Sequence, residues 1–588
     1  MTNQESAKAS QAGMRRQVAG GAAVMMLGIL GSRIAGLIRE RVIAHHFGQG
    51  FLTDIYSGAF TIPDLIFFLI AGGALSSAFI PVFAEYIEKN QEREAWRTFS
   101  VVATVMTFII TVLIILGEIF AHKLVLLTSP GFALIPHKVD DTVRLTRILL
   151  PAQLCFFLGG LMMGSLTARH IFIGQALGPI IYNIGIICGG LFLTARYGVA
   201  GLCFGAVGGA LIGNLLLQWI LVRRSGGYFV PPPMRATLTY WRQKRTGELR
   251  EMPATLAAYW KHPGARKVWR LMLPVILGLA LPPISAIINK MFASTLGNGP
   301  QSALMNANKL MNIPIAIFGQ AAGIAIFPTM AAQAARKDMV ALRRSVNFGV
   351  RSILFLTIPA SVFLIILSMP MVQLMLQTGK YSHADAEIAA AALRSFAVGV
   401  FAWSTQAVVA RGFYALQDTR TPVIVGTFVT VLFFTSNWLL IHYLGHRPFY
   451  ATAGLALLTS LSASILMLVL LVLLGRRLGG LNLRRIATST VKIIIASLIA
   501  GALVMGIRTV MEAHMQVLNQ PHPGSRVFFP ALILLSTCLA VGGSCYIGLA
   551  TILKMEETSV LRPVLARMSG PLTKLIRKAL KRAKPQAG

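Results

Sequence analysis

Long apolar segments follow one another along almost the whole chain, and they limit its fold more than any other feature. A hydrocarbon core of about 30 Å is spanned by roughly 20 apolar residues in a helix, and about fourteen segments reach that length. They are rich in Leu, Ala, Ile and Gly, without the alternation of lipid-facing strands. The sequence therefore predicts an all-α polytopic membrane protein with spans near 18–45, 53–87, 99–128, 142–168, 175–196, 198–222, 268–295, 301–335, 346–376, 385–413, 421–444, 450–475, 487–511 and 527–553.

The composition excludes a soluble globular protein, and the sequence has no motif that indicates an enzyme. Of the 588 residues, 55% are hydrophobic and 13% are charged, and the mean hydropathy is +0.68. The five cysteines lie in apolar segments without CxxC spacing, and the histidines form no HExxH motif. A P-loop and a nucleophile elbow are also lacking in the sequence. We expect no cofactor, no metal site and no catalytic residues.

The net charge of +34 is distributed as in a membrane protein rather than in a nucleic-acid binder. Basic residues gather in alternate loops, which is the positive-inside pattern for an even number of spans. This predicts a multi-pass protein of the cytoplasmic membrane with both termini in the cytoplasm, and no nucleic-acid partner. The basic segments are Arg15 and Arg16, Lys89 to Arg97, 223–270, Arg336 to Arg344, Arg411 to Arg420, Arg476 to Arg485 and the tail from Arg562.

An internal repeat divides the chain into two similar halves. Ile62 and Pro63 match Ile313 and Pro314, and later motifs follow in the same order. The pattern predicts two parallel six-helix repeats followed by two further helices, with alternating access between two lobes. A row of glycines, Gly201, Gly205, Gly209 and Gly213, indicates close helix packing in the sixth span. The expected domains are an N-terminal lobe (1–222), a basic linker (223–267), a C-terminal lobe (268–475), two last spans (476–553) and a basic tail (554–588).

Charges inside the first predicted span indicate a cavity or partner, because a charge at bilayer depth is costly. Arg33 and Glu40 are seven residues apart and share one helix face. Arg39 and Arg41 lie to either side, and a bend at Gly36 would bring the four charges closer together. The alternative is that residues 39–41 end the helix and reach to the interface. A basic cavity favours an anionic substrate, since guanidinium groups bind phosphate oxygens bidentately.

Six motifs, taken in order, resemble the MurJ (MviN) lipid II flippase family. They are "SRIAGLIRERVIAHHFG", "TDIYSGAF", "GALSSAFIPVFAEY", "TSPGF", "IINKMFASTLG" and "FYALQDTRTP", and the resemblance extends over roughly residues 20–510. It implies the fold of the multidrug/oligosaccharidyl-lipid/polysaccharide (MOP) exporter superfamily, with two lobes in a V around a cationic cavity. The last two helices would form a groove for the lipid tail. It also implies translocation of undecaprenyl-pyrophosphate-linked peptidoglycan precursor to the periplasmic leaflet, with lipid II, membrane lipids and cell-wall synthesis proteins as partners.

The resemblance also implies a binding site for the anionic headgroup. Asp54 would organise the arginines, or alternatively cap the helix that follows Thr53. Helix bends are expected at Gly36, Pro63 and Pro314. The headgroup residues carried over from the family are Arg33, Arg39, Glu40, Asp54 and Lys309, with Ser32, Arg41, Lys290 and Asn312 as additional candidates.

The sequence departs from the family pattern at four positions. Phe67 or Phe68 stands where the family has a basic residue, and Gly72 where it has an acid. Lys309 replaces an arginine, and Asn312 an acid. Two alternatives therefore stay open: a flippase for another polyprenyl-linked glycan of the O-antigen type, and a non-transporting scaffold. Membrane potential is a candidate energy source, at about 2.3 kcal/mol per elementary charge per 100 mV.

Two basic segments outside the spans have an amphipathic pattern. The linker 223–267 mixes aromatic and basic residues around Pro231 to Pro233, and the tail resembles a basic surface helix. We expect both to lie on anionic lipid. For the linker, docking of a partner protein is the alternative.

Overall fold

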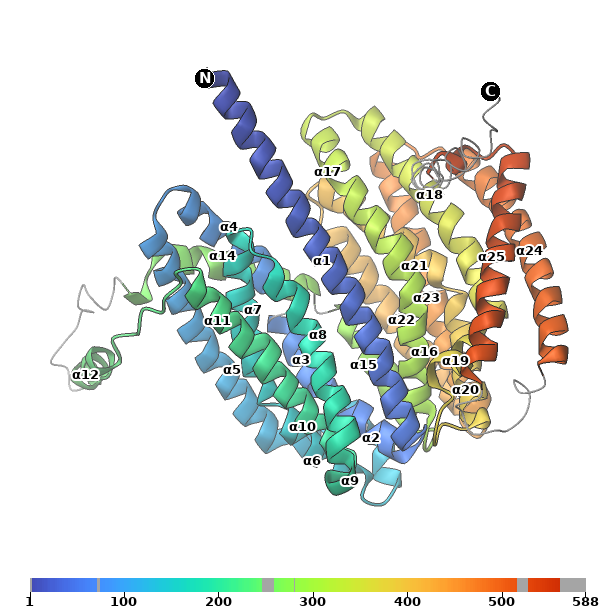
Figure 1. The fold of residues 1–588 in the computed structure, drawn as a ribbon, viewed down its shortest axis with the longest axis horizontal. Helices are drawn as coiled ribbons and strands as arrows, with labels where there is room; N and C mark the ends of the chain where they lie inside the picture. The colour runs from blue at the N-terminus through green and yellow to red at the C-terminus, as the bar shows by residue number, and fades with distance from the viewer. Residues whose placement is uncertain (1–2, 71–73, 246–258, 280, 516–526, 561–588) are drawn as a thin grey trace, which may run out of the picture. The chain divides into compact units, whose positions relative to one another are not determined.

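The computed structural model describes residues 3–70, 74–245, 259–279, 281–515 and 527–560, and this part of the chain is built from helices (Figure 1). In their described residues, all fourteen predicted segments are mainly helical. The elements are α1 (Asn3–Phe47), α2 (Phe51–Ala59), α3 (Thr61–Ile70), α4 (Ala74–Glu88), α5 (Glu92–Thr128), η1 (Pro130–Leu134), α6 (Lys138–Leu149), α7 (Ala152–Ala168), α8 (Ile173–Cys188), η2 (Gly189–Leu193), α9 (Thr194–Tyr197), α10 (Ala200–Gly209), η3 (Ala210–Leu216), α11 (Leu217–Arg224), α12 (Met234–Arg245), α14 (Pro263–Leu279), α15 (Leu281–Ser294), α16 (Pro300–Pro314), η4 (Ile315–Gln320), α17 (Ala321–Ala335), α18 (Met339–Ile366), α19 (Ser368–Leu376), α20 (His383–Ala397), α21 (Val400–Ala415), α22 (Arg420–Leu444), α23 (Pro448–Arg477), α24 (Leu483–His514), α25 (Phe528–Ile552) and η6 (Glu556–Val560).

The number of spans depends on how broken helices are counted. Among the described residues, 10 helices are long and apolar enough to cross a membrane, or 11 if the bent pair α20 and α21 is one span. The predicted spans that do not meet these criteria are 18–45, which lies in α1, and two that are divided. The segment 268–295 forms α14 and α15, and 301–335 forms α16, η4 and α17. Hydropathy predicted their helical state but not these divisions.

Packing divides the chain into two compact units. The first unit comprises Met1–Ser302 and Met375–Asp385, and the second comprises Ala303–Leu374 and Ala386–Gly588. In the first unit, α14 packs on α4 and α5 although its sequence belongs to the predicted C-terminal lobe. These units are defined by packing, whereas the predicted lobes are defined by the repeat, so the predicted boundaries stay predictions.

Close contact between α8 and α10 holds one side of the first unit together. A Cβ atom on Gly205 would lie 2.4 Å from the carbonyl oxygen of Gly185, and one on Gly209 would lie 2.8 Å from that of Tyr182. The helix backbones approach this closely because glycine has no side chain. The predicted packing role of the glycine row is confirmed.

In the second unit, α18 packs against α21 and α24, and α24 packs against α25. Tyr546 on α25 donates a hydrogen bond of 2.7 Å to the carbonyl oxygen of Phe355 on α18. The two last predicted spans, α24 and α25, are therefore attached to this unit through α18.

The predicted bends have different outcomes. Helix α1 runs without a break through Gly36, so the bend expected there is absent from this conformation (Figure 1). Pro63 lies in the first turn of α3, just after the interruption that separates helix α2 from helix α3. Pro314 ends α16 and is followed by the π-helical η4. Proline and π-helical turns are common causes of irregular helices, so the two prolines mark interruptions as expected.

The linker is helical at α12 and packed at its end. Tyr259 and His262 lie against α5, where His262 Nε2 is 2.7 Å from Glu94 Oε2 and His262 Nδ1 is 3.2 Å from Thr98 Oγ1. This end of the linker therefore contacts protein rather than lying as a free surface segment. The linker residues 246–258, the tail residues 561–588 and Gly72 lie outside the described residues.

Candidate functional site

The charged residues of α1 form a polar cluster with α8. Arg39 donates from Nε to Glu40 Oε1 at 3.0 Å and from Nη2 to the same oxygen at 2.5 Å. Its Nη1 donates to Asn183 Oδ1 on α8 at 2.9 Å. The side chains of Arg39 and Glu40 are only 21% and 11% exposed. A half-buried guanidinium is thus held by one carboxylate and one amide.

Asn183 fixes the geometry of this cluster. Its amide nitrogen donates to the carbonyl oxygen of Pro179 at 2.9 Å and approaches the carbonyl oxygen and Oγ of Ser32 at 3.3 Å and 3.4 Å. These contacts orient the amide so that its oxygen faces Arg39. Ser32, Arg39 and Glu40 therefore belong to one cluster, joined through an asparagine that the sequence interpretation did not include.

Arg33 differs from Arg39 in its surroundings. It lies on the same helix but is exposed, whereas Arg41 is half-buried. Three hydrogen bonds already direct the Arg39 guanidinium toward protein groups. Arg33 is therefore the more accessible cation, and Arg39 is the more rigid one.

A row of aromatic rings connects α3, α7 and α8. Phe67 on α3 meets Phe156 on α7 at a ring-centroid distance of 5.4 Å, and Phe156 meets Tyr182 on α8 at 5.1 Å. Tyr182 directly precedes Asn183. This row of rings lies beside the polar cluster and adds apolar surface there rather than charge.

Asp54 belongs to a different cluster from the one expected. Its carboxylate accepts from Lys138 Nζ at 3.0 Å and from the backbone N–H groups of Gly299 and Ser302 at 2.8 Å and 2.9 Å. Both charged side chains are 0% exposed. Asp54 therefore neither pairs with an arginine nor caps its own helix; it caps the first turn of α16.

The loop before α16 is shaped to receive this ion pair. Lys138 Nζ also donates to Asn298 Oδ1 at 2.8 Å and lies 4.4 Å from the centroid of the Phe132 ring. Gly297 and Gly299 adopt φ values of 96° and 105°, which favour glycine. The expectation that Asp54 organises the arginines is wrong in this structure, because the Asp54 carboxylate is paired with Lys138 instead.

Lys309 and the additional candidates Lys290 and Asn312 lie apart from the polar clusters described above. Lys290 on α15 donates to Thr61 Oγ1 at 2.9 Å and to the carbonyl oxygen of Ser57 at 3.1 Å, so it bridges the break between α2 and α3. In the second unit, Lys309 is half-buried on α16. Asn312, one turn further, is exposed and donates to the carbonyl oxygen and Oδ1 of Asn308, both at 2.9 Å.

Comparison with known proteins identifies the family. The family described as "Lipid II flippase MurJ" matches residues 43–520 of the chain. The chain belongs to this family. It is 28% identical over 490 residues to the "Probable lipid II flippase MurJ" of Buchnera aphidicola subsp. Acyrthosiphon pisum, covering 83% of this chain and 89% of the relative. It is 29% identical over 452 residues to the "Lipid II flippase MurJ" of Burkholderia cenocepacia, covering 76% and 82%.

Solved structures support the same fold. A structure titled "Lipid II flippase MurJ, inward closed conformation" matches with a TM-score of 0.67 and 21% identity, covering 92% of this chain and all of that one. An inward-facing multidrug resistance MATE transporter of the MOP superfamily matches with a TM-score of 0.60 and 13% identity, covering 76% and 94%. The predicted MurJ family and polytopic transporter fold are confirmed, and MurJ is a family of transporters rather than of catalytic enzymes.

Two residues of the polar clusters were not predicted from the sequence. Asn183 lies in the apolar segment "IIYNIGII". Its amide side chain among apolar neighbours was the available indication that it has a role. Lys138 lies just before a predicted span, where a lysine is ordinarily an interfacial residue. Neither its burial nor its pairing with a residue 84 positions away could be read from the sequence.

Proposed function

We propose that this chain is a lipid II flippase, which moves undecaprenyl-pyrophosphate-linked peptidoglycan precursor from the cytoplasmic to the periplasmic leaflet by alternating access. The match of the MurJ family over residues 43–520 is the observation that carries the proposal. The protein would lie in the cytoplasmic membrane with both termini in the cytoplasm, as the alternation of basic loops indicates. Its partners would be lipid II, membrane lipids and proteins of cell-wall synthesis.

In this mechanism, the headgroup meets its cations in sequence. Arg33 is exposed and makes the first contact with the pyrophosphate, because its guanidinium can donate two parallel hydrogen bonds. Arg39 follows, held in place by Glu40 and Asn183, and exchanges part of its contact with Glu40 for phosphate oxygens. Lys309 supplies a further positive charge from the second unit. Ser32, Arg41, Lys290 and Asn312 are additional candidates for contacts with the headgroup.

Asp54 has a different role in this proposal. It is fully buried and bonded to Lys138, so it holds the start of α16 instead of touching substrate. Its contribution to transport is therefore indirect. Substitution at Asp54 should reduce stability before it changes substrate selectivity.

A flippase for another polyprenyl-linked glycan is the second candidate. The contact of Phe67 with Phe156, where the family has a basic residue, favours a headgroup with fewer anionic contacts on α3. The pyrophosphate would bind α1 in the same way. The two candidates differ in the glycan, so a direct comparison of ligands separates them.

The experiment is native mass spectrometry of the full-length protein with three ligands: lipid II, an undecaprenyl-pyrophosphate O-antigen unit and a lipophilic cation. Wild type is compared with Arg33→Ala and Arg39→Ala, and with Arg196→Ala as an exposed control on α9. Loss of charge-assisted bonds predicts lipid II affinity about tenfold or more weaker in the first two variants and unchanged in the control. Preference for the O-antigen unit would support the second candidate. Binding that is unchanged in Arg33→Ala and Arg39→Ala would contradict both flippase candidates and support a non-transporting scaffold.

A further inference from the structure

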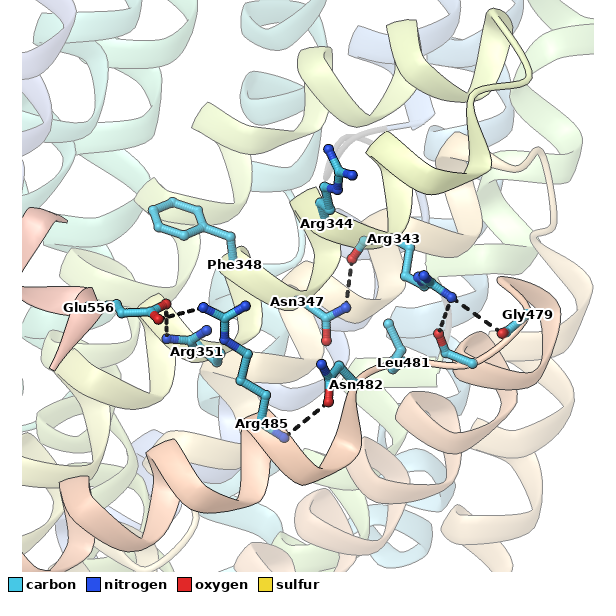
Figure 2. Close-up of a pocket in the computed structure, with 11 residues that line it drawn as sticks. Arg343, Arg344, Asn347, Phe348, Arg351, Gly479, Leu481, Asn482, Arg485 and Glu556 are labelled. Carbon is cyan, nitrogen blue, oxygen red and sulfur yellow. Dashed lines mark hydrogen bonds and ion pairs between the residues drawn. The ribbon is translucent and has the colours of Figure 1, made fainter.

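A pocket of about 610 Å³ lies within the second unit (Figure 2). It is formed by the first turns of α18, the turn between α23 and α24, the start of α24, and η6. Its size is in the range of small-ligand sites. We call it the arginine pocket; its lining residues are Arg343, Arg344, Asn347, Phe348, Arg351, Gly479, Gly480, Leu481, Asn482, Arg485 and Glu556.

The arginine pocket has more positive than negative charge. Four arginines line it, and Glu556 is the acid among its lining residues. Arg351 Nη2 lies 2.9 Å from Glu556 Oε2, and Arg485 Nη2 lies 2.5 Å from Glu556 Oε1. Hydrogen bonds from Arg485 and Arg351 lower the pKa of Glu556, which therefore stays ionised at neutral pH. Arg343 instead donates to the carbonyl oxygen of Gly480 at 3.3 Å.

The two acids of η6 are held very differently. Glu557 is 3% exposed and accepts from Arg351 Nε at 2.5 Å and from Ser489 Oγ at 2.7 Å. Glu556 is 59% exposed and forms ion pairs with Arg351 and Arg485. Glu557 is therefore fixed in the interior of the unit, whereas Glu556 remains accessible to solvent.

Exposed apolar side chains lie on the same helices as these charges. Phe348 lines the pocket and is 52% exposed, and Val340 and Leu483 are 52% and 50% exposed. They lie near the beginnings of α18 and α24, two helices that are apolar and long enough to cross a membrane. Exposed apolar residues beside arginines at a span end are typical of the level of the lipid headgroups.

We infer that the arginine pocket binds the headgroup of an anionic phospholipid of the phosphatidylglycerol type from the cytoplasmic leaflet. The phosphate lies between Arg485 and Arg351 and replaces Glu556, with charge-assisted hydrogen bonds from both guanidinium groups. Asn347 Oδ1 is buried and lacks a hydrogen-bond partner among the described residues, so it is available to accept a hydrogen bond from a glycerol hydroxyl. The acyl chains extend along the exposed apolar faces of α18 and α24. Basic pockets of this kind between span ends are suited to phospholipid headgroups.

The test uses the full-length, delipidated protein and three probes: phosphatidylglycerol, phosphatidylethanolamine with the same acyl chains, and soluble glycerol phosphate. Binding is measured by native mass spectrometry for wild type, Arg485→Gln and Glu556→Gln. The matched control is Arg484→Gln, because Arg484 is the exposed neighbour of Arg485 and does not line the pocket. Thermal unfolding of each variant shows whether it is folded.

The proposal predicts opposite effects for the two pocket variants. Arg485→Gln should weaken phosphatidylglycerol binding about fivefold or more, and Glu556→Gln should strengthen it about threefold, because the first removes a phosphate donor and the second removes the competing carboxylate. Arg484→Gln should change nothing, and phosphatidylethanolamine should bind more weakly than phosphatidylglycerol. A purely structural ion pair would not produce tighter binding in Glu556→Gln.

Three results would overturn the proposal. Equal losses in Arg484→Gln and Arg485→Gln would mean that diffuse surface charge attracts the lipid. Glycerol phosphate binding as tightly as the lipid would identify a site for soluble phosphate compounds. Weaker binding in Glu556→Gln would contradict the competition between Glu556 and phosphate. None of these results bears on lipid II binding at Arg33 and Arg39, which is measured separately.

Discussion

At the scale of residues, two arginines of α1 differ in how exposed and how rigidly held their side chains are. Arg33 is exposed, whereas Arg39 is held by Glu40 and Asn183. An arginine that is fixed in advance loses little side-chain entropy on binding an anion, and the adjacent carboxylate limits how tightly the anion is held. A transporter needs both properties, because it must release its substrate on the other side of the membrane.

Replacing Asn183 tests this arrangement. Asn183→Asp would place a second carboxylate against Arg39 and repel an anionic headgroup, so we expect lipid II affinity to fall by about tenfold, equivalent to about 1.4 kcal/mol. Asn183→Ala removes one hydrogen bond to a charged group without adding charge and should have a smaller effect. Titration by native mass spectrometry gives both values. Equal effects of the two substitutions would show that charge at this position is irrelevant.

The sequence was sufficient for the charged part of this cluster but not for its partners. Arg39 and Glu40 are unusual within an apolar segment, so hydropathy and family resemblance both point to them. Asn183 is 144 positions away from Arg39, and their contact depends on how α1 packs on α8. The predicted pairing of Asp54 with the arginines was wrong for the same reason, because tertiary packing decides which residues pair inside a membrane protein.

Lys138→Met would leave the Asp54 carboxylate buried without its cation. Breaking a buried ion pair on one side costs about 3–5 kcal/mol, so the variant should unfold at a clearly lower temperature in detergent. Adding Asp54→Asn should recover part of the loss, because it removes the unpaired charge. The control is Lys123→Met, an exposed lysine on α5. An equal loss in both lysine variants would contradict a specific role for the buried pair.

At the scale of elements, hydropathy located the helices but not their interruptions. In their described residues, all fourteen predicted segments are mainly helical, yet the breaks at α2 and α3 and at η4 depend on Pro63 and Pro314 together with the packing around them. The glycine row was more informative, since spacing alone indicated close contact. The structure adds which glycines face a neighbour and which do not.

Two glycines on α10 make a matched pair for this point. Gly205→Ala would place a Cβ 2.4 Å from the carbonyl oxygen of Gly185, whereas a Cβ on Gly208 meets no atom within 4 Å. Overpacking predicts that Gly205→Ala destabilises the protein by about 1–3 kcal/mol. Gly208→Ala should be neutral or slightly stabilising, since alanine favours helices. Thermal unfolding compares them, and equal stability of the two variants would show that α8 and α10 separate without cost.

At the scale of the whole molecule, charge is the property that links the chain to its membrane. The net charge of +34 is concentrated in alternate loops, where we expect it to orient the spans and attract anionic lipid. The arginine pocket is a local instance of this surplus, with arginines of α18 and α24 around one acid of η6.

Membrane potential should therefore change the rate of transport. With the interior negative, outward movement of an anionic headgroup is favoured by about 2.3 kcal/mol per net elementary charge per 100 mV, which corresponds to a change of at most about 50-fold for one charge. We expect faster translocation in proteoliposomes with an inside-negative potassium diffusion potential than at zero potential, and slower translocation when the potential is reversed. Arg33→Gln should lower the rate at every potential, because it removes a contact for the headgroup without removing the headgroup's own charge. Identical rates at all three potentials would mean that cations of the protein neutralise the substrate completely during its passage. The energy for net transport would then come from the concentration of lipid II alone.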